Sequence, residues 1–182
     1  MKYTVQKIVS GGQTGADTGA LIAARDLGVS TGGHAPRGFL TENGCRRDYL
    51  KSFGLSECSE GDSFAEKYRA RTKMNIIDSD GTLIIGDPNS PGSKLTHNTT
   101  LTEKKPLATF YFTSLENTKN VDWTQKIAQV AQWMIDNKIQ ILNVAGNRES
   151  KQPGIQDMVM RFVHELIVTH TQMTEEVDKN GN

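Results

Sequence analysis

The sequence predicts an α/β fold in which a doubly wound, mostly parallel sheet carries helices on both faces. Short apolar segments alternate with longer amphipathic segments along the chain, which is the order that parallel βαβ units require. The segment 81–86 (GTLIIG) is nearly all apolar, as strands buried on both faces are. With 182 residues, of which 36% are hydrophobic, the chain can bury the core of one domain. We expect this domain to span residues 1–171 and a polar, frayed tail to follow at 172–182.

A glycine-rich turn joins the first predicted strand to the first predicted helix. The strand ends near Val9, the turn reads SGGQTGAD over residues 10–17, and apolar residues at helical spacing continue to Leu27. Such a turn directs backbone N–H groups toward a ligand at the positive end of a helix, and its glycines allow close approach. We therefore expect an anion-binding loop, with a plain strand-to-helix connection as the alternative. The turn lacks the Gly-Lys-Ser/Thr of a P-loop and the G-x-G-x-x-G spacing of a dinucleotide site.

The remaining elements follow in a regular order. Their apolar and helical spacing predicts strands at 29–33, 81–86, 106–112 and 139–144, and helices at 63–75, 94–104, 121–137 and 155–170. The stretch HAPRGFLTENGCRRDYLKSFG at 34–54 is interpreted as a long irregular loop, and such loops usually carry function. Within it, Arg37 lies in a Pro-Arg-Gly turn suited to forked recognition of a phosphate, although a solvated loop has the same composition.

Two further polar loops follow predicted strands, at 87–93 (DPNSPGS) and 145–150 (AGNRES). The carboxyl ends of the strands in a doubly wound sheet lie on one edge, and ligands bind there. The three loops should therefore face one anionic ligand. The helix that starts near residue 63 adds a polar stripe with Tyr68, Arg71 and Asn75, which either faces the same ligand or is the wet side of the helix.

The bulk composition argues against several classes of protein. Lys plus Arg and Asp plus Glu each total 21, so no basic excess predicts nucleic-acid binding. No apolar run is long enough to span a membrane, and the first residues lack the features of a signal peptide, so we expect a cytoplasmic protein. The two cysteines and four histidines lack metal-ligand spacing, so we expect no metal site.

Five motifs occur in order: SGGQTGAD at 10–17, GGHAPRGFLTENG at 32–44, YRARTKMNIIDSDGTLII at 68–85, GSKLT at 92–96 and LNVAGNRESKQPGI at 142–155. Together they resemble the putative molybdenum cofactor carrier family, a branch of the Rossmann-like Smf/LOG superfamily. The resemblance implies a Rossmann-like homo-oligomer that needs no cofactor and binds a phosphorylated nucleotide-like or pterin-like ligand. The ligand-binding residues that it implies are Gly11, Gly12, Gln13, Thr14, Asp17, Arg37, Arg71, Asn75, Asp80, Gly92, Ser93, Thr96, Asn143, Gly146, Arg148 and Ser150.

Three functions are compatible with these residues. We favour a non-catalytic binding protein that carries, senses or sequesters a phosphorylated nucleotide-like molecule, for example as a sponge for a nucleotide immune signal, or a molybdopterin-type cofactor. The second is a LOG-type nucleoside monophosphate phosphoribohydrolase, an N-glycosidic hydrolase with a glutamate shortly after its P-G-G-x-G-T loop. The matching stretch here, 91–99, has no carboxylate, so Asp80, Asp17 or Glu149 would have to supply the acid, with Asp80 the first choice. The third is a structural module whose loops only close turns.

Overall fold

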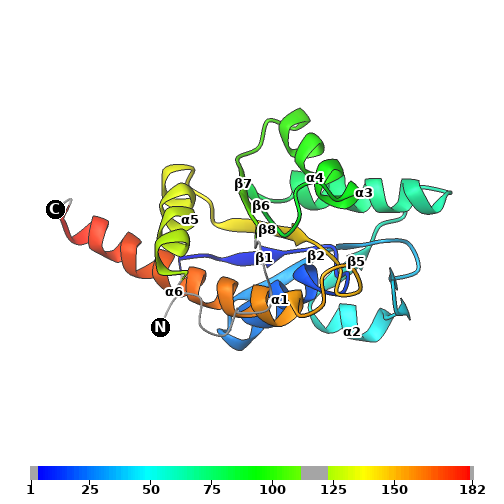
Figure 1. The fold of residues 1–182 in the computed structure, drawn as a ribbon, viewed down its shortest axis with the longest axis horizontal. Helices are drawn as coiled ribbons and strands as arrows, with labels where there is room; N and C mark the ends of the chain where they lie inside the picture. The colour runs from blue at the N-terminus through cyan, green and yellow to red at the C-terminus, as the bar shows by residue number, and fades with distance from the viewer. Residues whose placement is uncertain (1–3, 112–122, 181–182) are drawn as a thin grey trace.

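The computed structural model describes residues 4–111 and 123–180. Within them, six strands form one sheet in the order β5–β2–β1–β8–β6–β7, and every adjacent pair is parallel (Figure 1). This sheet confirms the predicted α/β fold. The predicted strand end at residue 112, the helix start at 121–122 and the last two tail residues lie outside the described residues. The strands are β1 (Lys7–Val9), β2 (Ser30–Ala35), β5 (Leu55–Glu57), β6 (Gly81–Ile85), β7 (Leu107–Phe110) and β8 (Ile141–Gly146).

Helices cover both faces of the sheet (Figure 1). Parallel crossovers are right-handed, so helices on connections that run toward β5 lie on one face and helices on connections toward β7 lie on the other. The first face carries α1 (Ala16–Asp26) and α5 (Thr124–Asp136), joined by the last helix, α6 (Ile155–Asn180). The second face carries α3 (Phe64–Ile77) and α4 (Pro91–Thr102).

The larger hydrophobic core lies between the sheet and α1, α5 and α6. Small side chains on α1 let it pack closely on α6, and a Cβ at Gly19 would overlap the carbonyl oxygen of Gln156. Phe162 of α6 is fully buried, and its ring stacks on Phe110 of β7 with 4.7 Å between the centroids. This packing holds α6 against the sheet and fixes where the loop before it, after β8, can lie.

The prediction of a long irregular loop at 34–54 is wrong. The stretch contains the end of β2, a hairpin of β3 (Leu40–Thr41) and β4 (Gly44–Cys45), and the short helix α2 (Arg47–Ser52), and it leads into edge strand β5. Each of these pieces is too short to give a readable hydrophobic period. They are held instead by a second hydrophobic core, which consists of Leu21, Ala35, Phe39, Leu50, Phe53 and Leu55.

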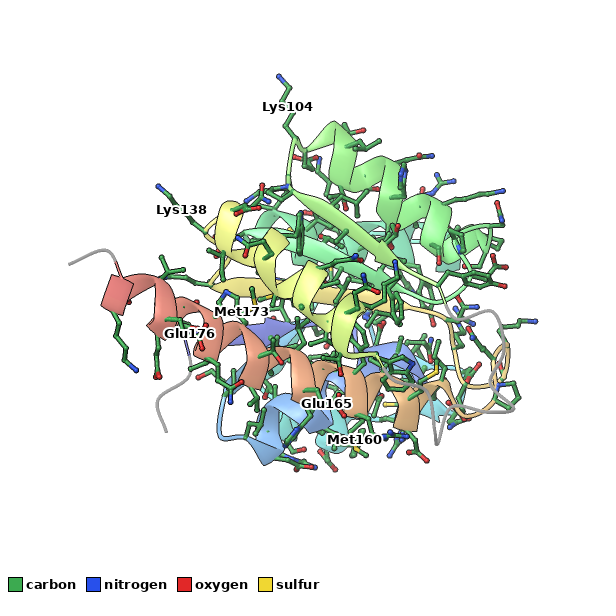
Figure 2. All side chains as sticks on the ribbon, turned by 60° about the vertical axis from the view of Figure 1, so that its left-hand side comes forward. Lys104, Lys138, Met160, Glu165, Met173 and Glu176 are labelled. Carbon is green, nitrogen blue, oxygen red and sulfur yellow. The ribbon has the colours of Figure 1, made fainter. Side chains whose placement is uncertain are left out.

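Three other chain segments differ from expectation or carry backbone strain. The last helix does not end near His170 but continues to Asn180, and its final turns project beyond the body of the protein (Figure 1). Lys104 and Lys138, each two residues after the last residue of α4 and α5, adopt left-handed φ angles of 55° and 54°, and their side chains project into solvent (Figure 2). Among the described residues, no helix is long and apolar enough to cross a membrane.

Candidate functional site: a cationic cavity at the carboxyl edge

Three loops meet at the carboxyl edge of the sheet because they follow three neighbouring strands. Strand β8 pairs with β1 on one side and with β6 on the other, so the ends of all three lie side by side. Their loops and one side of α3 enclose a cavity of about 390 Å³. Its lining residues are Gln13, Asp17, Ala65, Tyr68, Arg69, Arg71, Thr72, Ser90, Pro91, Gly92, Leu95, Thr96, Ala145, Gly146, Asn147, Arg148 and Lys151.

Close backbone packing holds the first and third loops together. The N–H of Ala16 donates to the carbonyl of Asn147 at 3.0 Å. A Cβ at Gly15 would overlap that same carbonyl, and a Cβ at Gly146 would overlap the carbonyl of Ile85. Gly15 is therefore required by the contact between the two loops, and Gly146 by the close pairing of the ends of β8 and β6.

A buried ion pair lies at the base of the cavity. Nη1 of Arg71 is 3.5 Å from Oδ2 of Asp17, and Asp17 is only 3% exposed. Burial raises the pKa of the Asp17 carboxyl, while the Arg71 guanidinium and the N–H of Gln13 oppose that rise. Arg71 reaches this position by lying flat against Gly11, where any Cβ would overlap its guanidinium.

Positive charge dominates the walls of the cavity. Arg69, Arg148 and Lys151 line it in addition to Arg71, and helix α4 begins there with its positive dipole end. The guanidinium carbons of Arg71 and Arg148 lie 5.7 Å and 5.3 Å from the centroid of the Tyr68 ring. An aromatic ring and two forked cations thus face one enclosed space, which suits a planar, anionic guest.

Several N–H groups of the first loop and of the start of α1 donate to other parts of the protein. The N–H of Gln13 donates to Asp17 at 3.2 Å, and the N–H of Thr14 donates to the side-chain oxygen of Gln13 at 3.0 Å. With the N–H of Ala16 bound to the third loop, the positive end of α1 is largely satisfied by the protein itself. These N–H groups are therefore used within the protein, and the cationic side chains add positive charge to the cavity.

The structure brings most of the predicted binding residues to this edge. Those that line the cavity are Gln13, Asp17, Arg71, Gly92, Thr96, Gly146 and Arg148. Thr14 and Ser150 lie beside it and hydrogen-bond to the carboxylate of Glu42. Gly11 lies beneath Arg71, whereas Ser93 is buried in the first turn of α4, where its N–H donates to Ser90 at 3.1 Å. A Cβ at Gly12 would point into the second core, at Leu50 and Leu55, rather than toward a ligand.

Besides the five residues just placed next to it, four more predicted binding residues do not line the cavity. Asp80 precedes β6, at the opposite edge of the sheet, and its carboxylate accepts the N–H groups of Gln140 and Ile141 at 3.0 Å and 2.7 Å. This position excludes it both as a ligand contact and as the acid of a reaction in the cavity. Arg37 is exposed and lies outside the cavity lining.

The other two are structural amides. Asn75 is 1% exposed, and its side chain accepts from the N–H of His34 at 2.7 Å and donates to the His34 carbonyl at 3.1 Å, which ties α3 to β2. Asn143 lies within β8 and donates to Thr82 of β6 at 3.2 Å. Glu149, the third acid considered, accepts the N–H groups of Gly154 and Gln156 at the start of α6.

Residue-based reasoning missed three contributors to the site. Arg69 and Lys151 are cations one or two positions from predicted residues, so the charge of each motif as a whole would have indicated them. Glu42 gave no such signal, because nothing local shows that the turn at 42–44 folds back onto the first loop. Over residues 4–111 and 123–180, no group of three His, Cys, Asp or Glu side chains is placed to hold a metal ion.

A second cavity, of about 420 Å³, opens at the amino edge of the sheet beside Thr4, Gln6 and Gln140. Its lining includes the apolar side chains of Met134 and Ile139, and burial lowers the pKa of His170 there. Because Lys138 is the one permanent cation among its described lining residues, it is less suited to a phosphorylated ligand than the cavity at the carboxyl edge.

Comparisons with known proteins agree with the resemblance that the five motifs indicated. The chain is similar to a crystal structure of a protein from Syntrophus aciditrophicus SB that is described as a putative molybdenum carrier protein. The two are 34% identical with a TM-score of 0.70, over 92% of this chain and 98% of that chain. A search of curated proteins found no significant match. A sequence model matches residues 8–167, which include all three cavity loops, and the chain therefore belongs to the circularly permutated YpsA SLOG family.

Proposed function

We propose that this protein is a non-catalytic binding protein that captures a phosphorylated nucleotide-like small molecule in the cavity at the carboxyl edge. One observation carries the proposal: four cationic side chains and the start of α4 surround the cavity, and Asp17 is the one carboxylate among its described lining residues. That carboxylate is already paired with Arg71. The cavity therefore keeps a positive charge that an anionic ligand would neutralise.

Unsatisfied polar atoms support a ligand at this place. Nε of Arg71 and Oδ1 of Asn147 are buried and have no hydrogen-bond partner among the described residues. Buried polar groups in folded proteins are rarely left unpaired, and both residues line the cavity. A phosphate oxygen would satisfy the guanidinium donor, and a ribose hydroxyl or the amino group of a base would satisfy the amide oxygen.

The size and the walls of the cavity fit a small organic phosphate. Its volume of about 390 Å³ lies at the lower end of the range for small-molecule sites. Tyr68 and Leu95 offer an aromatic ring and an apolar wall for a base, and the guanidinium groups of Arg71 and Arg148 near the Tyr68 ring would hold a phosphate. A phosphorylated pterin would meet the same groups, and the description of the Syntrophus relative as a molybdenum carrier supports a carrying role.

Hydrolysis of an N-glycosidic bond is the less supported alternative. The carboxylates of Asp80 and Glu149 accept hydrogen bonds from backbone N–H groups, and neither residue lines the cavity. Asp17 remains, and burial raises its pKa as a general acid requires, but it is 3% exposed and bound to Gln13 and Arg71. A leaving base therefore has little access to the Asp17 carboxylate that would have to protonate it.

Retention and release of a nucleotide panel would test the proposal. The protein is incubated with mononucleotides, cyclic nucleotides and ADP-ribose, freed of unbound compound, and denatured by heat, and the supernatant is separated by chromatography. Intact nucleotide supports capture, and free base with ribose phosphate supports hydrolysis. Retention of no phosphorylated compound would refute the proposal.

Charge-removing variants would locate the bound compound. Arg71→Gln and Arg148→Gln should each weaken binding by more than about tenfold, or roughly 1.4 kcal/mol. The matched control is Arg25→Gln, because the guanidinium of Arg25 lies over the Phe53 ring in the second core and outside the cavity lining. Equal affinity in all three variants would remove the cavity from the binding site.

The predicted homo-oligomer stays a prediction, which light scattering on the purified protein would test.

A further inference from the structure

The turn between β3 and β4 carries a carboxylate that binds two of the cavity loops. Glu42 accepts hydrogen bonds from the hydroxyl of Thr14 in the first loop and from the hydroxyl of Ser150 in the third. The N–H of Ser150 also donates to this carboxylate, at 3.2 Å. Three donors from two separate loops thus converge on one anionic group that belongs to neither loop.

This arrangement adjoins the cavity. The side-chain oxygen of Gln13 accepts the N–H of Glu42 at 2.9 Å, and the Gln13 amide donates to the Tyr68 hydroxyl at 3.3 Å. Gln13 and Tyr68 both line the cavity. Arg148, another lining residue, acts on the Glu42 carboxylate through its charge. An anion at the position of this carboxylate would therefore continue directly into the cavity.

The chemistry of the three donors is that of an oxyanion site. Hydroxyl and N–H donors bind carboxylate and phosphate oxygens alike, and bonds to a charged acceptor are the stronger kind. Burial opposes ionisation of Glu42, but the hydrogen bonds from Ser150 and Thr14 outweigh it and lower the pKa of the carboxyl. Glu42 is therefore ionised at neutral pH, as a phosphate group would be.

We propose that Thr14 and Ser150 form an oxyanion subsite of the ligand cavity, and that Glu42 fills this subsite in the free protein in place of an anionic group of the ligand. A ligand that reaches the subsite then displaces Glu42 and releases the β3–β4 hairpin. The proposal rests on the proposed function, and it adds a second anionic contact to the ligand and a conformational response to binding.

Competition between Glu42 and an external anion for the subsite predicts the direction in which the affinity changes when Glu42 is replaced. While Glu42 holds the subsite, the apparent affinity for an external anion is reduced by the fraction of protein in which the subsite is free. Glu42→Gln keeps the size of the side chain but removes the charge that these donors bind. The variant should therefore bind inorganic pyrophosphate on the order of threefold to tenfold more tightly than the natural chain.

Titration calorimetry with pyrophosphate tests this expectation. Glu103→Gln serves as the matched control, because it removes the same charge at the far end of α4, where Glu103 pairs with Lys73 at 3.5 Å. Adding Ser150→Ala to the Glu42→Gln variant should cancel the gain, since it removes a donor of the subsite. An affinity that is unchanged or lower in Glu42→Gln, equally raised in the control, or absent from both proteins would overturn the proposal.

Hydrogen exchange of the hairpin gives an independent readout. Pyrophosphate at saturation should speed amide exchange over residues 39–46 in the natural chain, because those residues lose the anchor that Glu42 provides. Unchanged or slower exchange in the presence of bound pyrophosphate would overturn the displacement. If the nucleotide panel is retained through Arg71 but the hairpin does not respond, the proposed function stands and only this inference fails.

Discussion

The substitution Gly11→Ala should separate the guanidinium of Arg71 from the carboxylate of Asp17 although neither residue is itself mutated. The backbone of Gly11 lies outside the left-handed region, so alanine fits its conformation. The new Cβ would, however, overlap the end of the Arg71 side chain. Because that end is flexible, we expect the guanidinium to swing away while the fold persists.

The expected cost follows from the ion pair that is lost. Breaking a fully buried pair costs about 3–5 kcal/mol, because the remaining charge has no partner. Here the Nη1–Oδ2 distance is 3.5 Å and the Arg71 side chain is 14% exposed, so the interaction is weaker than in the fully buried case. Asp17 can also take up a proton. We therefore expect a loss of about 2 kcal/mol in the free energy of unfolding at neutral pH.

The dependence of this loss on pH identifies its cause. Burial already raises the folded-state pKa of Asp17 above its ordinary value, so the folded protein holds this proton more tightly than the unfolded chain does. The free energy of unfolding therefore falls as the pH rises from the unfolded-state pKa of Asp17 through its higher folded-state pKa. Without Arg71 the folded-state pKa rises further, so the deficit of the variant should be small near about pH 4 and larger near about pH 7.

Urea unfolding followed by circular dichroism at these two pH values measures the deficit. The control is Gly92→Ala, because a Cβ at Gly92 meets nothing within 4 Å, and alanine in the first turn of α4 should leave stability unchanged or slightly higher. A deficit of equal size at both pH values would assign the loss to packing, and no deficit at all would show that Arg71 does not stabilise Asp17. Either result refutes the reasoning.

Three further substitutions separate the site from its surroundings. Arg37→Gln should leave nucleotide retention unchanged because Arg37 lies outside the cavity lining, and a tenfold loss in the same assay would contradict that placement. Asp80→Ala should lower the free energy of unfolding by about 1–2 kcal/mol, because the N–H groups of Gln140 and Ile141 lose their acceptor, and equal stability in urea would contradict this role. Lys138→Gly should raise the free energy of unfolding by about 0.5 kcal/mol, because glycine adopts the left-handed backbone at this position without strain. This value already subtracts the stability lost because glycine makes the unfolded chain more flexible. A lower melting temperature of the variant would contradict this expectation.

Most of the fold could be predicted because its longer elements carry a full hydrophobic period. Buried strands β6 and β8 and the amphipathic helix α5 each show their pattern over several residues. The hairpin, α2 and β5 could not be predicted, since they are ordered by tertiary contacts of Phe39, Leu50 and Phe53. The length of α6 could have been, because no glycine or proline interrupts residues 155–180.

Several predicted binding residues that follow a strand line the cavity, whereas Asp80 precedes a strand and does not. Gln13, Gly92 and Arg148 come after β1, β6 and β8, and all three line the cavity. Asp80 comes before β6, so a parallel sheet must place it at the opposite edge. That rule needs only the direction of the chain. Applied to the motif 68–85, it would have separated Arg71 from Asp80 without any coordinates.

The glycines of the first loop show why a glycine-rich motif alone does not identify a ligand-binding loop. A glycine is required wherever backbone or side chains come too close for a Cβ, and a ligand is only one possible neighbour. At Gly15 the neighbour is the third loop, at Gly12 it is the second core, and at Gly11 it is Arg71. The first two serve the packing of the fold, and only Gly11 serves the cavity, by giving a cation room. The proposed binding of an anion should therefore be lost most selectively on substitution of Gly11, whereas substitutions at Gly12 or Gly15 should unfold the edge of the sheet and so report on stability rather than on the ligand.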